Sequence, residues 1–225
     1  ALTRPDNPLT ARVLVNPVWG RHLGTPLVKS TADFGVRTEP PADPALLDFL
    51  AVRFMANGWS LKQLHRDILC SATYRQASDP GDSSEIQSRF DHNARLDPAN
   101  TWHWRMNRKR FDFEALRDSL LYVTGSLDET LGGLPVDMFQ DKTTPRRTLY
   151  GFIDRQNLPG VLRSFDFANP DTTSPQRFQT TVPQQALFMM NNAFLIELAR
   201  SATTRRDFTT LASDAERVRW LYQQI

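Results

Sequence analysis

WHWRMNRKRFDFEALRDSLLYVTG, residues 102–125, is the stretch that best indicates the fold class. Asp112 is a predicted helix N-cap, Glu114 follows in the first turn, where the helix dipole favours an anion, and Gly125 is a predicted end. Apolar side chains between these limits recur at the spacing of a core-facing stripe: Phe113, Leu116, Leu120 and Leu121. The stretch therefore predicts an amphipathic helix.

Similar start and stop signals occur along the rest of the chain, with predicted N-caps at Asn7, Asp43 and Ser60. They predict further helices at about 8–24, 44–57, 61–75, 98–102, 159–165, 182–191, 193–198 and 214–222. Pro17 would remove a backbone hydrogen bond inside the first of these, at a cost of about 3 kcal/mol, and predicts a kink or a break there. Only residues 147–153 have the composition of a strand. The predicted class is mainly α, an irregular helical array with long loops and at most a small β-hairpin or short sheet.

Length and local composition indicate the domain organisation. A chain of 225 residues can bury a sizeable core, and we expect a single, mostly helical domain over 1–225. Residues 77–100 are polar and rich in turn formers, which indicates an internal linker or a long loop. The chain begins close to a helix-start signal and stops within a predicted helix, so we expect it to be truncated at both ends.

Composition argues against several classes of protein. A net charge of +2 is low for nucleic-acid binding. A single cysteine, Cys70, excludes a disulfide scaffold, a multi-cysteine metal site and covalent attachment of c-type haem; the apolar neighbours of Cys70 predict that it packs in the core. No apolar run is long enough to span a membrane, and no signal peptide is visible. Because the four histidines lack the spacing of metal ligands, we expect neither a metal nor another cofactor.

The cations of the chain are the best candidates for a functional surface. Arg105, Arg108, Lys109 and Arg110 form a block that contains no acidic residue, beside two tryptophans that could stack on a sugar or a base. The predicted ligand-binding residues are Trp102, Trp104, Arg105, Arg108, Arg110, Arg146, Arg147 and Arg155. The alternative is structural: these arginines pair with acidic side chains and fasten loops to helices.

Catalysis by paired carboxylates is a second alternative. A polysaccharide-active enzyme would draw its acids from Asp112, Glu114, Asp166 and Asp171. The sequence has no G-x-S-x-G elbow, P-loop or G-x-G-x-x-G motif, so it assigns no catalytic residue.

Several blocks of sequence together resemble the planctomycete-specific domain one family, a domain of unknown function. The matching residues are NPLTARVLVNPVWGRHLG (7–24), TADFGVRTEPPADPALLDFLA (31–51), GWSLKQLHRDILCSATYRQ (58–76), WRMNRKRFDFEALRDSLL (104–121), RRTLYGFIDR (146–155) and TTVPQQALFMMNN (180–192). The blocks cover nearly the whole chain in the order of the family. The sequence departs from the family at Pro17, where an arginine is expected.

The resemblance implies a module of large exported proteins of planctomycetes and related bacteria. Such a module usually follows another domain of unknown function, often with a c-type cytochrome-like segment upstream and sometimes with carbohydrate-binding modules. A periplasmic or cell-surface location follows, and no catalytic residue carries over. We therefore expect a non-catalytic accessory or binding module that contacts neighbouring domains of the same protein or an anionic polysaccharide; a polysaccharide-active enzyme and a purely structural scaffold are the alternatives.

Overall fold

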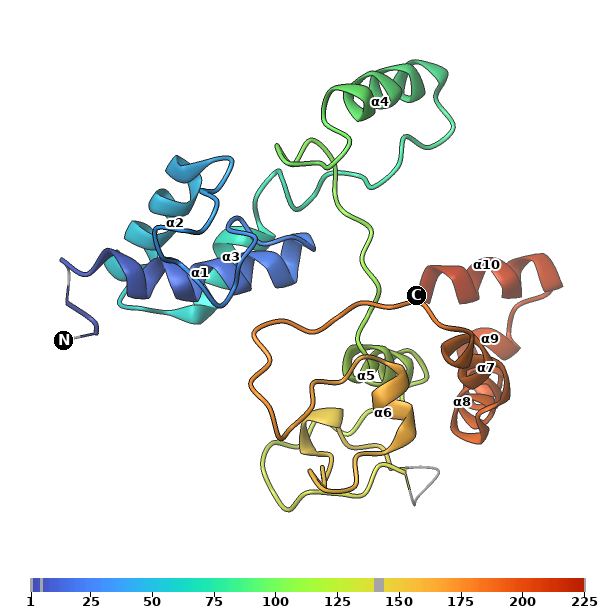
Figure 1. Cartoon of the computed structure of the whole chain (residues 1–225). Coiled ribbons are helices and arrows are strands. Elements are labelled where there is room, and N and C mark those ends of the chain that lie inside the picture. Colours follow the sequence, from blue (N-terminus) through green and yellow to red (C-terminus); the bar gives the residue numbers. More distant parts are fainter. Residues whose placement is uncertain (1, 5, 140–143, 225) are drawn as a thin grey trace. The chain divides into compact units, whose positions relative to one another are not determined.

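The computed structural model describes residues 2–4, 6–139 and 144–224 (Figure 1). This part of the chain is mainly α-helical, as predicted, and its only β-type pairings are isolated bridges that join Asp128 to Arg146 and Val136 to Gly151. None of its helices is both long and apolar enough to cross a bilayer. Packing divides the chain into two compact units, Ala1–Lys109 and Arg110–Ile225. Each unit is described by itself, and the single domain predicted for 1–225 stays a prediction.

Three helices of the first unit pack against one another: α1 (Pro8–Leu23), α2 (Pro44–Ala56) and α3 (Leu61–Leu69) (Figure 1). Each predicted N-cap is present, because the side chains of Asn7, Asp43 and Ser60 accept hydrogen bonds from the first turns. The buried faces of the three helices share one apolar cluster, which includes Val15, Trp19, Leu47, Phe54 and Ile68.

Two details of these helices differ from the prediction. Helix α1 runs through Pro17 without the break that was one of the two predicted outcomes. It ends at Leu23, and its C-cap Gly24 has a left-handed backbone (φ 87°) whose N–H donates to the Gly20 carbonyl. Helix α3 ends at Leu69, well before residue 75, and Cys70 is its exposed C-cap. The core position predicted for Cys70 is therefore wrong, since the buried face of α3 carries Leu64 and Ile68 and Cys70 points away from it.

The stretch 77–100, predicted as a linker or loop, contains helix α4 (Ser84–Leu96), which has no buried residue (Figure 1). Ser83 caps this helix and Asp97 ends it. The short helix predicted after Asp97 is not formed, and residues 97–104 make turns instead. Asp97 explains the difference, because its carboxylate accepts the backbone N–H groups of Thr101 and Trp102 and so holds a turn.

The second unit contains α5 (Phe113–Val123), the 3₁₀ helix η1 (Thr148–Tyr150), α6 (Gly160–Ser164), α7 (Pro183–Asn191), α8 (Ala193–Thr204), α9 (Arg206–Thr209) and α10 (Asp214–Gln224). Asp112 caps α5 as predicted and accepts the Ala115 N–H at 2.8 Å. The residues predicted as strand-like form η1 instead of a strand. Gly151, directly after η1, pairs with Val136 in an isolated bridge. The residues between α6 and α7 are a long loop, as predicted.

The buried face of α5 differs from the predicted stripe. Phe113, Arg117 and Leu121 are buried, whereas Leu116 and Leu120 are only partly covered. These three residues are four apart and therefore lie on one side of the helix. Phe113 joins Leu158, Leu162 and Phe165 in an apolar cluster. A charged residue thus occupies the middle of the face that packs inward.

Candidate functional site

The predicted ligand-binding residues divide between the two units. Trp102, Trp104, Arg105 and Arg108 belong to the first, and Arg110, Arg146, Arg147 and Arg155 belong to the second. Lys109, at the end of the first unit, donates to the carbonyls of Arg21 and His22 at the C-terminus of α1. A cation is stabilising at that end of a helix, so this member of the cation block has a structural contact.

The turn at 97–107 positions the two tryptophans. Hydrogen bonds from backbone N–H groups hold the pKa of Asp97 below its usual value, although burial acts to raise it. The Trp104 indole donates to the Asp97 carbonyl at 2.9 Å, and Asn100 is buried at the centre of the turn. The Trp102 side chain, by contrast, is 67% exposed.

Arg105 and Arg108 lie in or directly after this turn, and each contacts another side chain. The Arg105 guanidinium lies 5.3 Å from the centre of the Trp104 ring, a cation–π arrangement. Arg108 Nη2 lies 3.4 Å from Asp79 Oδ2, and both side chains are well exposed. An exposed ion pair of this kind contributes little to stability, so it leaves Arg108 available to a ligand.

Arg110 connects three segments of the second unit. It donates to the Thr180 carbonyl, to Gln185 Oε1 at 2.6 Å and to Asp166 Oδ2 at 2.8 Å. Asp166 also accepts the backbone N–H and the hydroxyl of Thr180 at 2.7 Å each. Burial acts to raise the pKa of Asp166, but these hydrogen bonds and the Arg110 charge lower it below its usual value. Arg110 therefore fastens the loop between α6 and α7 to the residues before α5.

The other three arginines of the predicted site also have partners within the second unit. Arg146 Nη1 lies 3.6 Å from Asp128 Oδ2, and its guanidinium stacks 4.4 Å from the centre of the Tyr150 ring. Arg147 Nε lies 3.8 Å from the carboxylate of Asp118. Arg155 Nε lies 3.7 Å from the carboxylate of Asp171. The assignment of these residues to ligand binding stays a prediction, and their geometry favours an internal structural role.

The four carboxylates considered for catalysis have internal partners as well. Asp112 caps α5, and Glu114 is bound by both Nη atoms of Arg177 at 2.7 and 2.9 Å. Asp166 and Asp171 pair with the arginines described above. General acid catalysis needs a carboxyl group whose pKa is raised toward neutrality, whereas the pKa of Asp166 is lowered. All four carboxylates therefore make structural contacts within the second unit.

Two histidines form a contact that the sequence analysis missed. His22 Nε2 and His65 Nδ1 lie 2.7 Å apart, joining the end of α1 to α3. Burial lowers the pKa of His22, and the charges of His65 and Lys109 lower it further. Among residues 2–4, 6–139 and 144–224, no three His, Cys, Asp or Glu side chains gather closely enough to hold a metal ion.

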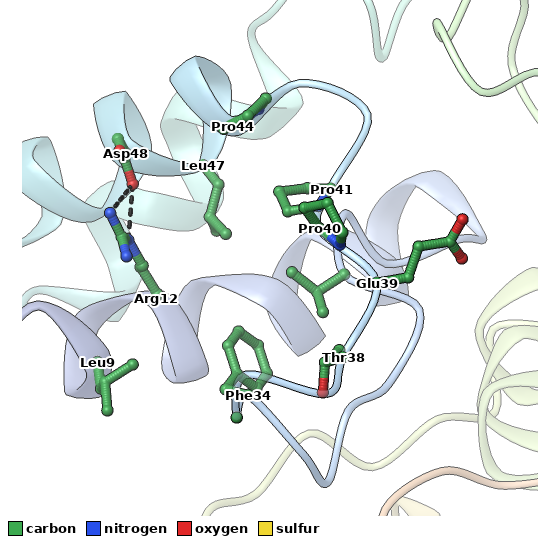
Figure 2. Close-up of a pocket in the computed structure, with 12 residues that line it drawn as sticks. Leu9, Arg12, Phe34, Thr38, Glu39, Pro40, Pro41, Pro44, Leu47 and Asp48 are labelled. Atoms are coloured by element: carbon green, nitrogen blue, oxygen red, sulfur yellow. Dashed lines mark hydrogen bonds and ion pairs between the residues drawn. The ribbon is translucent and has the colours of Figure 1, made fainter.

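A pocket in the first unit was also missed (Figure 2). Its volume is about 210 Å³, and α1, α2 and the loop at 28–41 line it. In Figure 2 Leu47 and Phe34 point toward one another across the cavity, with Pro40 and Pro41 on one side and the Arg12–Asp48 ion pair on the other. Sequence patterns could not place this pocket, because its walls come from segments about thirty residues apart.

Comparison with known proteins gives one family. The model of PSD1, described as a protein of unknown function (DUF1553), matches residues 1–225. No curated protein and no solved structure matches the chain.

Proposed function

The chain belongs to the PSD1 family, and we propose that it is a non-catalytic accessory module of an exported multidomain protein that contacts a partner domain through helix α2. The internal pairing of the candidate carboxylates supports the absence of catalysis, and the resemblance of the sequence supports a periplasmic or cell-surface location. The observation that carries the partner contact is the apolar character of both faces of α2.

The outer face of α2 is apolar although the inner face already packs in the core. Phe49 and Val52 are 60% and 61% exposed, and exposed alanines lie on either side of them at positions 45 and 56. The spacing of four, three and four residues places all four side chains in one stripe, as in the seam between packed helices. An exposed apolar stripe on a helix that already packs its other face in the core is typical of a contact surface, so a helix of a partner domain is the occupant that we propose.

Radical footprinting tests the partner contact. We expect Phe49 to be oxidised at least several times more slowly in the full-length protein than in the 225-residue chain, because a partner helix would exclude solvent from its ring. Phe178, which is 82% exposed on a loop, is the control and should react equally in both. Equal reactivity of Phe49 would exclude the proposed contact. A dimer of the isolated chain whose formation protects Phe49 would instead make a second copy the occupant.

Binding of an anionic polysaccharide is a second candidate, supported by the exposed side chains of Trp102 and Arg108 in the same segment. We expect sulfated or uronic polysaccharides, but not neutral ones, to raise the melting temperature at low salt. A ligand that binds only the native state stabilises it by about 2.7 kcal/mol at a hundredfold excess over Kd. Trp102→Ala combined with Arg108→Gln should abolish the shift, whereas Arg89→Gln on exposed α4 should retain it. No shift with any acidic polysaccharide would reject this candidate.

A further inference from the structure

We infer that the pocket between α1, α2 and the loop at 28–41 binds an aromatic side chain of a polypeptide, whose backbone C=O and N–H groups contact Arg12 and Asp48. This inference rests on the proposed function and specifies what the partner inserts into the first unit. Three features of the pocket support this inference: its size, its preformed shape and the polar groups at one edge.

Size and lining favour an aromatic ring. Leu47 and Val28 are buried side chains of the lining, and Phe34 and the prolines extend this apolar part of the wall. An apolar cavity of roughly 150 Å³ in another protein stays dry and accepts benzene, so about 210 Å³ is enough for a larger ring such as a phenol or an indole. Aromatic side chains gain much of their binding free energy from this kind of burial.

Hydrogen bonds and prolines restrict the backbone of the residues that line the pocket. The side-chain amide of Asn16, which is fully buried, donates to the Val28 carbonyl at 2.9 Å and accepts the Val28 N–H at 2.8 Å. Pro40, Pro41 and Pro44 restrict the backbone of the opposite wall, because the ring of proline fixes φ. A preformed pocket loses little conformational entropy on binding.

The polar edge of the pocket complements a peptide group. Arg12 Nε and Nη2 both approach the same oxygen of Asp48, Oδ1, at 2.6 Å. Among the described residues, neither Arg12 Nη1 nor Asp48 Oδ2 has a hydrogen-bond partner. Arg12 Nη1 can still donate and Asp48 Oδ2 can still accept, so the polar edge offers partners to the C=O and the N–H of a polypeptide backbone. The ligand class is therefore an aromatic residue within a polypeptide, and not a free hydrocarbon or an isolated anion.

The test is a titration of the 225-residue chain with N-acetyl-tryptophanamide. The NMR signals of the Leu47 and Val28 methyl groups report the binding. We expect saturable shifts of both signals, weaker binding of indole, and no binding of N-acetyl-alaninamide. Asp48→Asn and Arg12→Gln should each lower the affinity for N-acetyl-tryptophanamide by about tenfold. This is the effect of losing one hydrogen bond to a charged group. Arg53→Gln is the matched control: it removes an ion pair of the same helix, with Asp67, outside the pocket and should leave the affinity unchanged.

Three results would overturn the inference: no saturable methyl shift, equal affinity for indole and N-acetyl-tryptophanamide, or unchanged affinity in both pocket variants. Each variant is compared with the wild type by its methyl spectrum without ligand, so that a misfolded variant is recognised. These results are separate from the footprinting of Phe49, because Phe49 lies on the outer face of α2 and does not line the pocket. Protection of Phe49 without binding of N-acetyl-tryptophanamide would keep the proposed function and reject the aromatic ligand.

Discussion

Replacement of Arg117 by methionine is expected to lower the free energy of unfolding of the second unit by about 3 to 5 kcal/mol, the cost of breaking a buried charged network. The Arg117 side chain is only 4% exposed. Its guanidinium donates to the Thr144 carbonyl at 2.6 Å, to the Arg146 carbonyl at 2.8 Å and to the Thr148 hydroxyl at 3.1 Å. Methionine fills a similar volume but donates nothing, so two carbonyls lose their partner.

Charge and shape both contribute to this effect. Burial lowers the pKa of Arg117, and the carboxylate of Asp118, 3.8 Å away, opposes that shift. Arg117 also lies 5.3 Å from the centre of the Phe194 ring on α8. The planar fork of arginine reaches two carbonyls at once, whereas the single ammonium of lysine does not. Arg117→Lys should therefore recover only part of the stability that Arg117→Met loses.

Chemical denaturation and hydrogen exchange together measure this effect. The amides of residues 144–151 should exchange faster in Arg117→Met, because Arg117 holds this segment against α5. Arg163→Met, at an exposed position of α6, is the control and should change stability by less than about 0.5 kcal/mol. Equal stability of the Arg117 and Arg163 variants would show that the guanidinium network contributes nothing to folding.

Sequence patterns predicted the helices of this chain well because helix ends depend on neighbouring residues. The caps at Asn7, Asp43, Ser60 and Asp112 were all confirmed, since each needs only a side-chain oxygen within three residues of the first turn. The left-handed turn at Gly24 was equally predictable. Local chemistry therefore determined where most elements begin.

Contacts between distant residues could not be predicted in this way. Arg117 has the helical spacing of the buried face, but its charge argues for exposure, and its carbonyl partners lie about thirty residues further along the chain. Arg110 likewise binds groups 56 to 75 residues away. The internal pairing of the cations therefore depends on tertiary structure, and the sequence could offer it only as an alternative to a binding surface.

Asn16 carries the second large expected effect. Asn16→Leu should lower the free energy of unfolding of the first unit by about 2 to 5 kcal/mol, because both polar groups of Val28 would remain buried without a partner. Leucine has the same number and branching of side-chain heavy atoms as asparagine and is somewhat larger, so the loss does not arise from a cavity. Asn57→Ala, at the exposed C-cap of α2, is the control and should cost less than about 0.5 kcal/mol.

Asn16→Asp gives this prediction a dependence on pH. In the ionised form one carboxylate oxygen would face the Val28 carbonyl in a buried site, so we expect the folded-state pKa of the new carboxyl to lie above the ordinary value of about 3.9. Below that ordinary value the protonated group can donate to the Val28 carbonyl as asparagine does. The stability deficit relative to the wild type should therefore be small in acid and grow as the pH rises through the raised pKa. A deficit independent of pH would mean that the site has rearranged and that Asn16 does not hold the loop that lines the pocket.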